Sequence, residues 1–346
     1  MANKLFASSF LQETLYPSIS TPRSVSFSNG VTMTLLQRGV LQVSPPVVRD
    51  SCKHIVLSSA VHGNETAPIE LLDELVRLIS EQKLTPEHPL LFVIAHPQSI
   101  LEETRFIETN LNRLFGHQHY PDSLELTIAC NLKEQIKQFW QDTAIQSRWH
   151  LDMHCSIRAS KHYTFAISPQ SSYPTRDKEF VSFMLQGGIE ALLLSEEASS
   201  TFSWFSASEW GAQAATFELG QVAQLGCNDP QKLTSFSQAL MELIQLNPDQ
   251  QHEETQDSSM IFYQVHESIY RENEQFELCF DDALANFSHF GLGEPLAKDG
   301  QRVLTMPIEQ GRVVFPNANV ERSQRAALIV KPCATHYVDK QLKVCD

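Results

Sequence analysis

The sequence contains no sustained run of basic residues. Its 346 residues include 26 lysines and arginines against 41 aspartates and glutamates, which gives a formal net charge of −15. A protein that follows a nucleic-acid backbone needs a basic patch or stripe, so this distribution predicts no nucleic-acid partner. A small anionic substrate would need a local group of arginines that acts against the overall negative field.

Long apolar runs are also missing. No hydrophobic segment approaches the roughly 20 residues that a membrane-spanning helix needs, and residues 1–8 lack the apolar core of a signal peptide. The seven cysteines are odd in number and form no C-x-x-C pair, which favours free thiols over a disulfide framework. We therefore expect a cytoplasmic protein with no membrane partner.

What is present is an ordinary globular composition, with 42% hydrophobic and 19% charged residues, enough to build a large core. A polar, acidic run follows Asn247-Pro248 and has the character of an exposed linker. This change predicts a catalytic domain over residues 1–247, a linker at about 248–257 and a small β-rich domain over 258–346.

Within the first domain, short apolar runs alternate with amphipathic segments. The patterns predict a hairpin at 25–43 and strands at 54–60, 90–95, 149–154, 163–168, 191–194 and 215–219. They predict helices after Thr66, which can cap the first of them, and at 124–140, 177–186 and 230–246. The segment 98–122 has little periodicity and is predicted to be a long functional loop. The alternation indicates an α/β fold, a mixed and mostly parallel sheet flanked by helices.

Beyond the linker the runs are short and rich in β-formers. Those at 261–270, 276–280, 302–306, 311–315 and 326–330 are separated by Gly and Pro, which predicts a small all-β domain.

One stretch carries the first chemical signal. His62 and Glu65 lie three residues apart in a polar turn with Gly63, directly after an apolar strand. Imidazole nitrogen and carboxylate oxygen are zinc ligands, and a hydrolytic site usually uses three protein ligands and keeps one position for water. The pair predicts two of the three.

A third ligand is predicted near the end of the strand at 149–154. Asp152 and His154 share a face of that strand, so Asp152 can orient the imidazole of His154. His150 is on the same face and is a rival ligand. Cys155 has no indicated base and is read as incidental, and Arg158 is a candidate for a further positive group.

A lone carboxylate, Glu218, ends an apolar strand just before Gly220. In a partly desolvated pocket, such a group is suited to proton transfer. A glutamate on an edge strand that faces water is an equally weighted alternative.

The loop before the helix at 124–140 contains Arg105, Asn112 and Arg113. Arginine is suited to bidentate capture of a carboxylate, although a solvated surface loop would contain the same residues. His117 and His119 form a weak competing metal pair in this loop.

Four segments together resemble the zinc carboxypeptidase superfamily, and most closely its succinylglutamate desuccinylase/aspartoacylase branch. They are His62-Gly63-Asn64-Glu65, Asn110-Leu111-Asn112-Arg113-Leu114-Phe115, Asp152-Met153-His154 and Phe217-Glu218-Leu219-Gly220. The C-terminal stretches 314–320 and 324–328 extend the likeness, which covers most of the chain.

The resemblance implies a mixed sheet with a small appended β domain and one Zn²⁺ per chain. The implied roles are metal binding by His62, Glu65 and His154, acid–base catalysis by Glu218, oxyanion stabilisation by Arg105, and substrate carboxylate binding by Asn112 and Arg113. The implied reaction is hydrolysis of N-succinyl-L-glutamate to succinate and L-glutamate, the last step of an arginine catabolic route. Another N-acyl amino acid amidohydrolase or a zinc carboxypeptidase is the alternative, since these motifs do not determine the acyl group. A structural zinc protein is the non-enzymatic alternative, although such sites are usually rich in cysteine.

Overall fold

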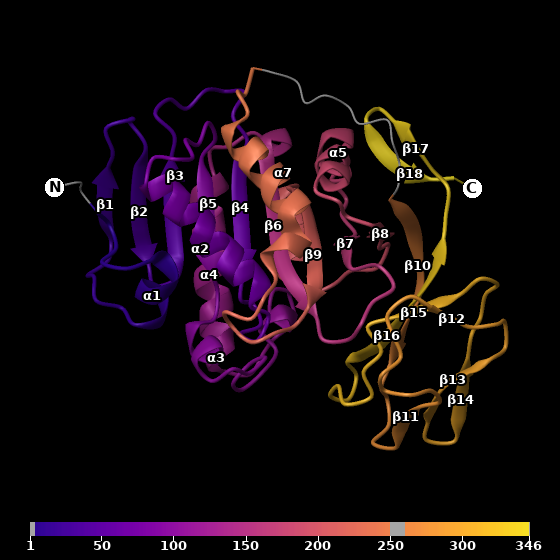
Figure 1. Ribbon diagram of the computed structural model, residues 1–346. Helices are drawn as coiled ribbons and strands as arrows, with labels where there is room; N and C mark the ends of the chain where they lie inside the picture. The colour runs from indigo at the N-terminus through magenta and orange to yellow at the C-terminus, as the bar shows by residue number, and fades with distance from the viewer. Residues whose placement is uncertain (1–3, 250–259, 346) are drawn as a thin grey trace.

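A computed structural model of the chain describes residues 4–249 and 260–345. Within these residues a mixed sheet of thirteen strands crosses the whole molecule, with helices packed on both of its faces (Figure 1). The mixed α/β sheet with a small β-rich C-terminal part confirms the predicted fold class. The part of the predicted linker from residue 250 onwards lies outside the described residues.

The strands of the large sheet follow the spatial order β1-β2-β3-β5-β4-β6-β9-β7-β8-β10-β16-β15-β12. Their bounds are β1 Arg23–Ser26, β2 Thr32–Gln37, β3 Val40–Ser44, β4 His54–Ser59, β5 Leu90–Ile94, β6 Arg148–Ser156, β7 Thr164–Ser168, β8 Ala191–Leu194, β9 Gln213–Gln221, β10 Ile261–Tyr270, β12 Ser288–His289, β15 Arg312–Val314 and β16 Arg325–Pro332. A separate sheet contains β11 Phe276–Leu278, β13 Pro295–Asp299 and β14 Arg302–Thr305, and a hairpin contains β17 Thr335–Val338 and β18 Gln341–Val344.

The helices are short to medium in length. They are α1 Phe10–Leu15, α2 Ala67–Ser80, α3 Pro97–Leu101, α4 Leu124–Trp140, α5 Lys178–Gln186, α6 Phe202–Trp210 and α7 Thr234–Gln245, with 3₁₀ turns η1 Leu111–Arg113, η2 Ile145–Ser147 and η3 Pro230–Leu233.

Parallel pairing is concentrated at the centre of the sheet. Strand β4 pairs in parallel with β5 and β6, and β6 pairs in parallel with β9. Every residue of β6 is buried, as is every residue of β9 except Gln221, because helices cover both faces. This burial on both faces explains why these strands appear in the sequence as continuous apolar runs.

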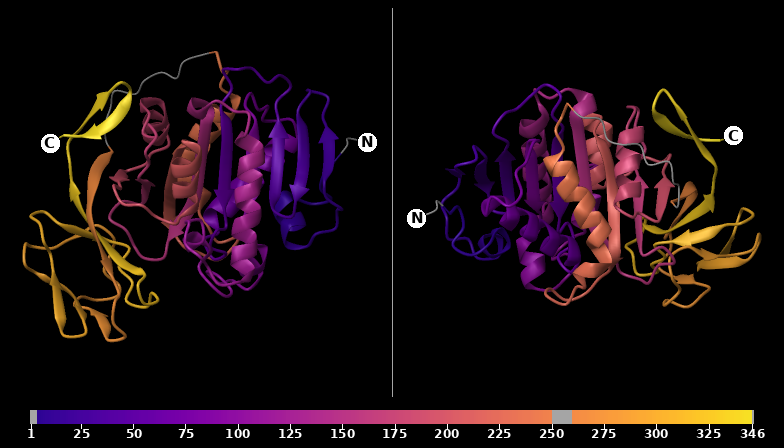
Figure 2. Two further views of the ribbon diagram at one scale, coloured as in Figure 1. Left: turned by 180° about the vertical axis from the view of Figure 1, so that it is seen from behind. Right: turned by 45° about the horizontal axis from the view of Figure 1, so that its top comes forward.

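Two apolar clusters lie on opposite faces of the sheet. One contains core residues of α2, α5 and α7, such as Leu72, Phe180 and Leu240. The other contains residues of α4 and α6, such as Ile136 and Phe202. The two views of Figure 2 show the covered faces in turn. The carboxyl ends of the central parallel strands are left for the site.

The C-terminal part is joined to this sheet. Strand β10 pairs in parallel with β8, so the sheet continues across the predicted domain boundary. The hairpin of β17 and β18 returns to α5, where the Lys178 N–H donates to the Lys340 carbonyl and Leu342 enters the main core. The boundaries 1–247 and 258–346 stay a prediction.

Two local predictions are wrong. Thr66 precedes α2, but its hydroxyl donates to the Ala223 carbonyl at 2.8 Å and makes no capping bond to the helix. The predicted loop at 98–122 begins inside α3 and contains η1, so it is only partly irregular. Helix α6 was not predicted, because its aromatic residues surround the helix and form no single apolar stripe. Among the described residues, no helix is long and apolar enough to cross a membrane.

Candidate active site

Three of the predicted site residues meet beside the ends of two neighbouring strands. His62 and Glu65 follow β4 in a tight turn, and His154 is near the end of β6, the parallel neighbour of β4. Their ligand atoms lie within 4.8 Å of one another, and each side chain is only 2% exposed. This is the only such group of three His, Cys, Asp or Glu residues in the part of the chain that the structure describes.

The hydrogen bonds of the two imidazoles fit a metal site. Nε2 of His62 lies 2.9 Å from Oδ1 of Asn110, and Nε2 of His154 lies 3.2 Å from Oδ2 of Asp152. With each Nε2 donating to an oxygen, both Nδ1 atoms are directed at the Glu65 carboxylate, at 2.9 and 2.7 Å. Metal-binding histidines are usually oriented in this way by a second hydrogen bond. The predicted contact between Asp152 and His154 is present, and the orienting role of Asp152 stays a prediction.

His150 does not belong to the ligand group. Its Nε2 lies 2.8 Å from the Ser58 hydroxyl and its Nδ1 lies 2.7 Å from the Ser206 hydroxyl. The Ser58 hydroxyl in turn donates to Asp152 at 2.6 Å, so His150 is connected to His154 only through this buried chain. The competing metal pair of His117 and His119 is not supported either, because His117 is exposed and pairs with Glu209 at the surface.

Glu218 lies beside the ligands in the next strand. It is the register partner of His154 across the parallel pair β6 and β9, and its carboxylate accepts a hydrogen bond from Ser156 at 3.1 Å. The side chain is 7% exposed, which excludes the water-facing alternative. Burial, reinforced by the negative charge of Glu65, raises the pKa of Glu218 to about 7. A carboxylate with such a pKa is matched to proton transfer near neutral pH.

The neighbouring charges in the ligand group shift one another's pKa values. Burial would raise the pKa of Glu65, but the neighbouring His62, His154 and Arg105 hold it well below its usual value. Burial lowers the pKa of His62 to about 4, with a further contribution from Arg105. His62 is therefore neutral at physiological pH, which is the form that binds a metal.

The loop between α3 and η1 reaches this group from the side. Arg105 donates through Nη1 to the Glu65 carboxylate, and its carbonyl accepts from the Gly63 N–H at 3.2 Å. Gly63 packs against the backbone of Ser99 and Ile100 so closely that a Cβ at this position would overlap them. The turn that carries His62 and Glu65 therefore needs a glycine at this close approach.

A residue that the sequence reading missed fixes this loop. Glu125, in the first turn of α4, accepts hydrogen bonds from the backbone N–H groups of Ile107, Glu108 and Thr109 at 2.8, 3.0 and 3.3 Å. Its carboxylate also lies 3.0 Å from Nε2 of His96. Burial alone would raise the pKa of Glu125, but these bonds lower it. The sequence signal was an acidic residue two positions after the capping Ser123, which is equally typical of an exposed helix start.

Positive charge collects on another wall of the site. Arg113 on η1 is half-buried, and burial together with Arg325 and Arg105 lowers its pKa to about 9. Arg325 begins β16, and burial likewise lowers its pKa. Arg325 was also missed, because nothing in its local pattern distinguishes it from a surface arginine. Guanidinium groups that are close together and poorly solvated need an anion to complete the site.

Asn112 is already partly engaged. Its Oδ1 accepts from the Phe202 N–H at 3.0 Å, and the side chain is 5% exposed. Only its amide nitrogen is left to contact a substrate, so the structure limits the predicted carboxylate-binding role of Asn112 to donation.

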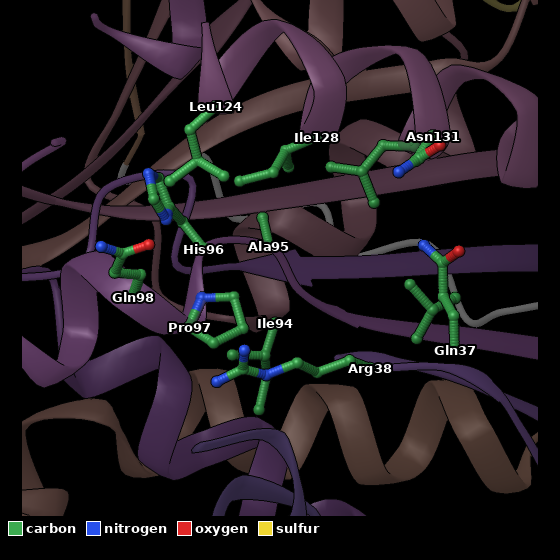
Figure 3. A pocket seen from close by; sticks show the side chains of 12 residues that line it. Gln37, Arg38, Ile94, Ala95, His96, Pro97, Gln98, Leu124, Ile128 and Asn131 are labelled. Carbon is green, nitrogen blue, oxygen red and sulfur yellow. The ribbon is translucent and has the colours of Figure 1, made fainter. Parts of the chain in front are cut away.

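All seven predicted site residues line one cavity of about 1090 Å³. Its wall also includes residues of the C-terminal part, among them Tyr270 and Arg325. A smaller cavity of about 270 Å³ lies elsewhere, between α4 and the hairpin residues Gln37 and Arg38 (Figure 3). His96 lines this second cavity, but none of the predicted site residues does.

Comparison with known families agrees with this arrangement. The family model of the succinylglutamate desuccinylase/aspartoacylase catalytic domain matches residues 51–244, and that of the AstE/AspA barrel-sandwich hybrid domain matches residues 258–333. The chain belongs to the succinylglutamate desuccinylase/aspartoacylase family. The resemblance inferred from the four motifs is confirmed.

Individual members of the succinylglutamate desuccinylase/aspartoacylase family match over nearly the full length. A succinylglutamate desuccinylase from Vibrio campbellii is 46% identical over 343 residues, which is 99% of each chain. The X-ray structure of a succinylglutamate desuccinylase from Vibrio parahaemolyticus has a TM-score of 0.94 at 44% identity, covering 99% of this chain and 100% of that one. Murine aminoacylase 3, at 19% identity and a TM-score of 0.58, shares the fold, covering 86% of this chain and 100% of that one.

Proposed function

We propose that this protein hydrolyses the amide bond of N-succinyl-L-glutamate with the help of one bound Zn²⁺, releasing succinate and L-glutamate. One observation carries the proposal. A buried His–Glu–His group and a carboxylate with a raised pKa share a single cavity with several arginines. The full-length likeness to proteins named succinylglutamate desuccinylase supports the choice of substrate. The expected place in arginine catabolism stays a prediction.

The donor set fits zinc. His62, Glu65 and His154 supply two imidazoles and one carboxylate, a ligand set that leaves a position for water. When bound, zinc would supply Lewis acidity, polarising the substrate carbonyl and lowering the pKa of water. The Nδ1 atoms of His62 and His154 both point at the Glu65 carboxylate, whereas Nδ1 of His150 contacts the Ser206 hydroxyl. This difference supports His62, Glu65 and His154 as ligands over any set that includes His150.

Glu218 is placed to move the proton. Its carboxylate accepts a proton from the attacking water as the new carbon–oxygen bond forms. It then delivers that proton to the amide nitrogen as the carbon–nitrogen bond breaks, so that the amine leaves as a neutral group. The Ser156 hydroxyl holds the carboxylate from one side while burial keeps its pKa high.

Arg105 is the candidate for stabilising the oxyanion. Its guanidinium already lies against Glu65 at the edge of the ligand group, and its side chain is 29% exposed. Negative charge on the former carbonyl oxygen grows in the transition state, and a donor placed there is typically worth roughly 3–4 kcal/mol.

N-Succinyl-L-glutamate has three carboxylates, which explains why an acidic protein concentrates arginines here. Arg113 and Arg325 form the binding surface for the glutamate half, with Asn112 donating from the same wall. Their mutual repulsion is relieved when a carboxylate lies between them.

The decisive experiment compares purified, zinc-loaded protein on N-succinyl-L-glutamate, N-acetyl-L-glutamate, N-acetyl-L-aspartate and a glutamate-terminated dipeptide. We expect the highest kcat/KM on N-succinyl-L-glutamate. A preference for N-acetyl-L-aspartate would assign the other activity that the family name includes. A preference for the dipeptide would assign a carboxypeptidase, and turnover of none of them would contradict the proposal.

A further inference from the structure

Arg158 lines the main cavity, and its guanidinium is only partly paired. Its side chain is 17% exposed, and its Nη1 is buried with no hydrogen-bond partner among the described residues. Its Nη2 is paired with Asp282 at 3.5 Å, but the Asp282 side chain is 74% exposed. Such a long contact to a solvated carboxylate does little to compensate a buried charge. A buried donor without an acceptor is costly, and an anionic ligand would remove the cost.

The chain places Arg158 beyond the catalytic carboxylate. His154 and Ser156 lie at the end of β6, Arg158 lies two residues beyond it, and all three line the cavity. His154 belongs to the ligand group, and Ser156 holds Glu218. Two further residues span at most roughly 7 Å, so Arg158 stays within side-chain reach of the reacting centre.

Arg158 also has a different partner from the other arginines. Its ion-pair partner Asp282 lies in the loop after β11, whereas Arg113 lies on η1 and interacts with Arg325 at the start of β16. The cavity is therefore lined by arginines from separate segments of the chain, and Arg158 is not among the charges that shift the pKa of Arg113. A substrate with carboxylates on both sides of its amide bond needs this arrangement.

We propose that Arg158 binds the free carboxylate of the acyl group and selects succinyl donors over uncharged ones. The proposal rests on the proposed function, since it assigns one end of that substrate. Arg113 and Arg325 hold the glutamate half, and the guanidinium of Arg158, which lines the cavity, donates to the succinyl carboxylate two methylenes beyond the reacting carbonyl. An acetyl group has no carboxylate at this position and makes no charged contact with Arg158.

The test compares N-succinyl-L-glutamate with N-butyryl-L-glutamate, which keeps the four-carbon acyl chain but ends in a methyl group. In Arg158→Met we expect kcat/KM for the succinyl compound to fall roughly 30- to 5000-fold, the range for removing one partner of a buried charge pair. The value for the butyryl compound should change less than about threefold, because it makes no charged contact there. Arg158→Lys, which keeps the charge but not the planar fork, should restore part of the preference.

The control is Arg302→Met, which removes an exposed arginine of β14 outside the cavity and should alter neither value. An equal fall on both substrates in Arg158→Met would overturn the proposal, and so would an unchanged ratio. If Arg158→Met does not fold, an unchanged ratio in Arg158→Lys has the same meaning.

Direct binding separates this proposal from the proposed function. Calorimetry should show that the wild type binds succinate more tightly than butyrate and that Arg158→Met loses the difference. If the wild type hydrolyses neither amide but binds succinate in this Arg158-dependent way, the proposed reaction fails while the assignment of Arg158 stands. If succinate and butyrate bind equally to the wild type, the assignment fails.

Discussion

The carboxylate of Glu125 lies 3.0 Å from Nε2 of His96, and both side chains are fully buried. Because Nδ1 of His96 accepts from the Ser99 N–H, its Nε2 carries the proton and donates to Glu125. The same carboxylate accepts from three successive N–H groups of the loop that carries Arg105. One buried anion therefore connects α3, α4 and the loop that contains Arg105.

Glu125→Gln tests this connection. The substitution keeps the shape but replaces an acceptor by an amide NH₂ that opposes the loop donors. We expect unfolding in urea at pH 7 to show a loss of roughly 2–3 kcal/mol. We also expect kcat to fall while zinc content stays at one per chain, since the metal ligands are untouched. Glu134→Gln, on an exposed position of the same helix, is the matched control.

The pH dependence of this loss has a definite sign. The pKa of Glu125 is lowered from 4.5 in the folded state, so its contribution is complete above about pH 4.5 and is lost as the pH falls through the folded-state pKa. The stability difference between wild type and Glu125→Gln should therefore shrink only in acid. A difference that disappears between pH 7 and 5 would contradict this explanation.

The metal ligands give a second prediction. His154→Ala should lose bound zinc in elemental analysis, because it removes one of three donors whose atoms lie within 4.8 Å of one another. His117→Ala, a change at a surface histidine paired with Glu209, should keep full occupancy. Retention of zinc by His154→Ala would show that the ligand set is different.

Chelation distinguishes a catalytic from a structural metal. Removal of zinc should abolish turnover while leaving the circular dichroism spectrum intact, because a large apolar core surrounds the sheet independently of the ligands. Unfolding on chelation would support the structural alternative.

Arg113 and Arg325 give a fourth prediction. Arg113→Ala should raise KM for N-succinyl-L-glutamate by at least about tenfold with a smaller effect on kcat, because the charge is used in binding. Arg325→Ala should do the same, and the double variant should lose less than the product of the two effects if, as proposed, both guanidinium groups bind one carboxylate. Arg322→Ala, an exposed neighbour of Arg325, is the control. An unchanged KM in both single variants would remove the anchoring role.

The sequence predicted the ligand group because its members are close to strand ends that periodicity can locate. His62 and Glu65 follow one apolar run, and His154 and Glu218 lie at the same register of two others, β6 and β9. Parallel strands bring such positions together at one edge of a sheet, so the pattern was sufficient to predict their proximity.

What the sequence could not predict depends on contacts between distant segments. Glu125 was indistinguishable from an exposed acidic residue at a helix start until the loop N–H groups were found on its carboxylate. Arg325 is more than two hundred residues from Arg113 in sequence and reaches it only because β10 continues the large sheet. Thr66 had the residue type of a helix cap, but the Ala223 carbonyl competes for its hydroxyl.

Glu218 gives the last prediction, in both activity and stability. Glu218→Gln should retain zinc but lose almost all turnover, because an amide cannot accept the proton of water. In the wild type kcat/KM should fall in acid as Glu218 is protonated, with the limb at or below pH 7, since the pKa of about 7 is that of the metal-free site and a bound cation would lower it.

The same carboxylate should destabilise the metal-free protein as the pH rises. Its pKa is raised from 4.5 in the unfolded chain to about 7 in the folded one, so the cost is absent below pH 4.5 and complete above about pH 7. A shift of this size corresponds to at most about 3 kcal/mol. Urea unfolding of the chelated proteins should show that the free energy of unfolding of Glu218→Gln rises relative to that of the wild type between pH 5 and pH 8. The free energy of unfolding of Glu134→Gln should not rise relative to the wild type over this range. If the difference in free energy of unfolding between Glu218→Gln and the wild type does not depend on pH, Glu218 is ionised without cost in the folded state. The physical argument for Glu218 as the base would then fail.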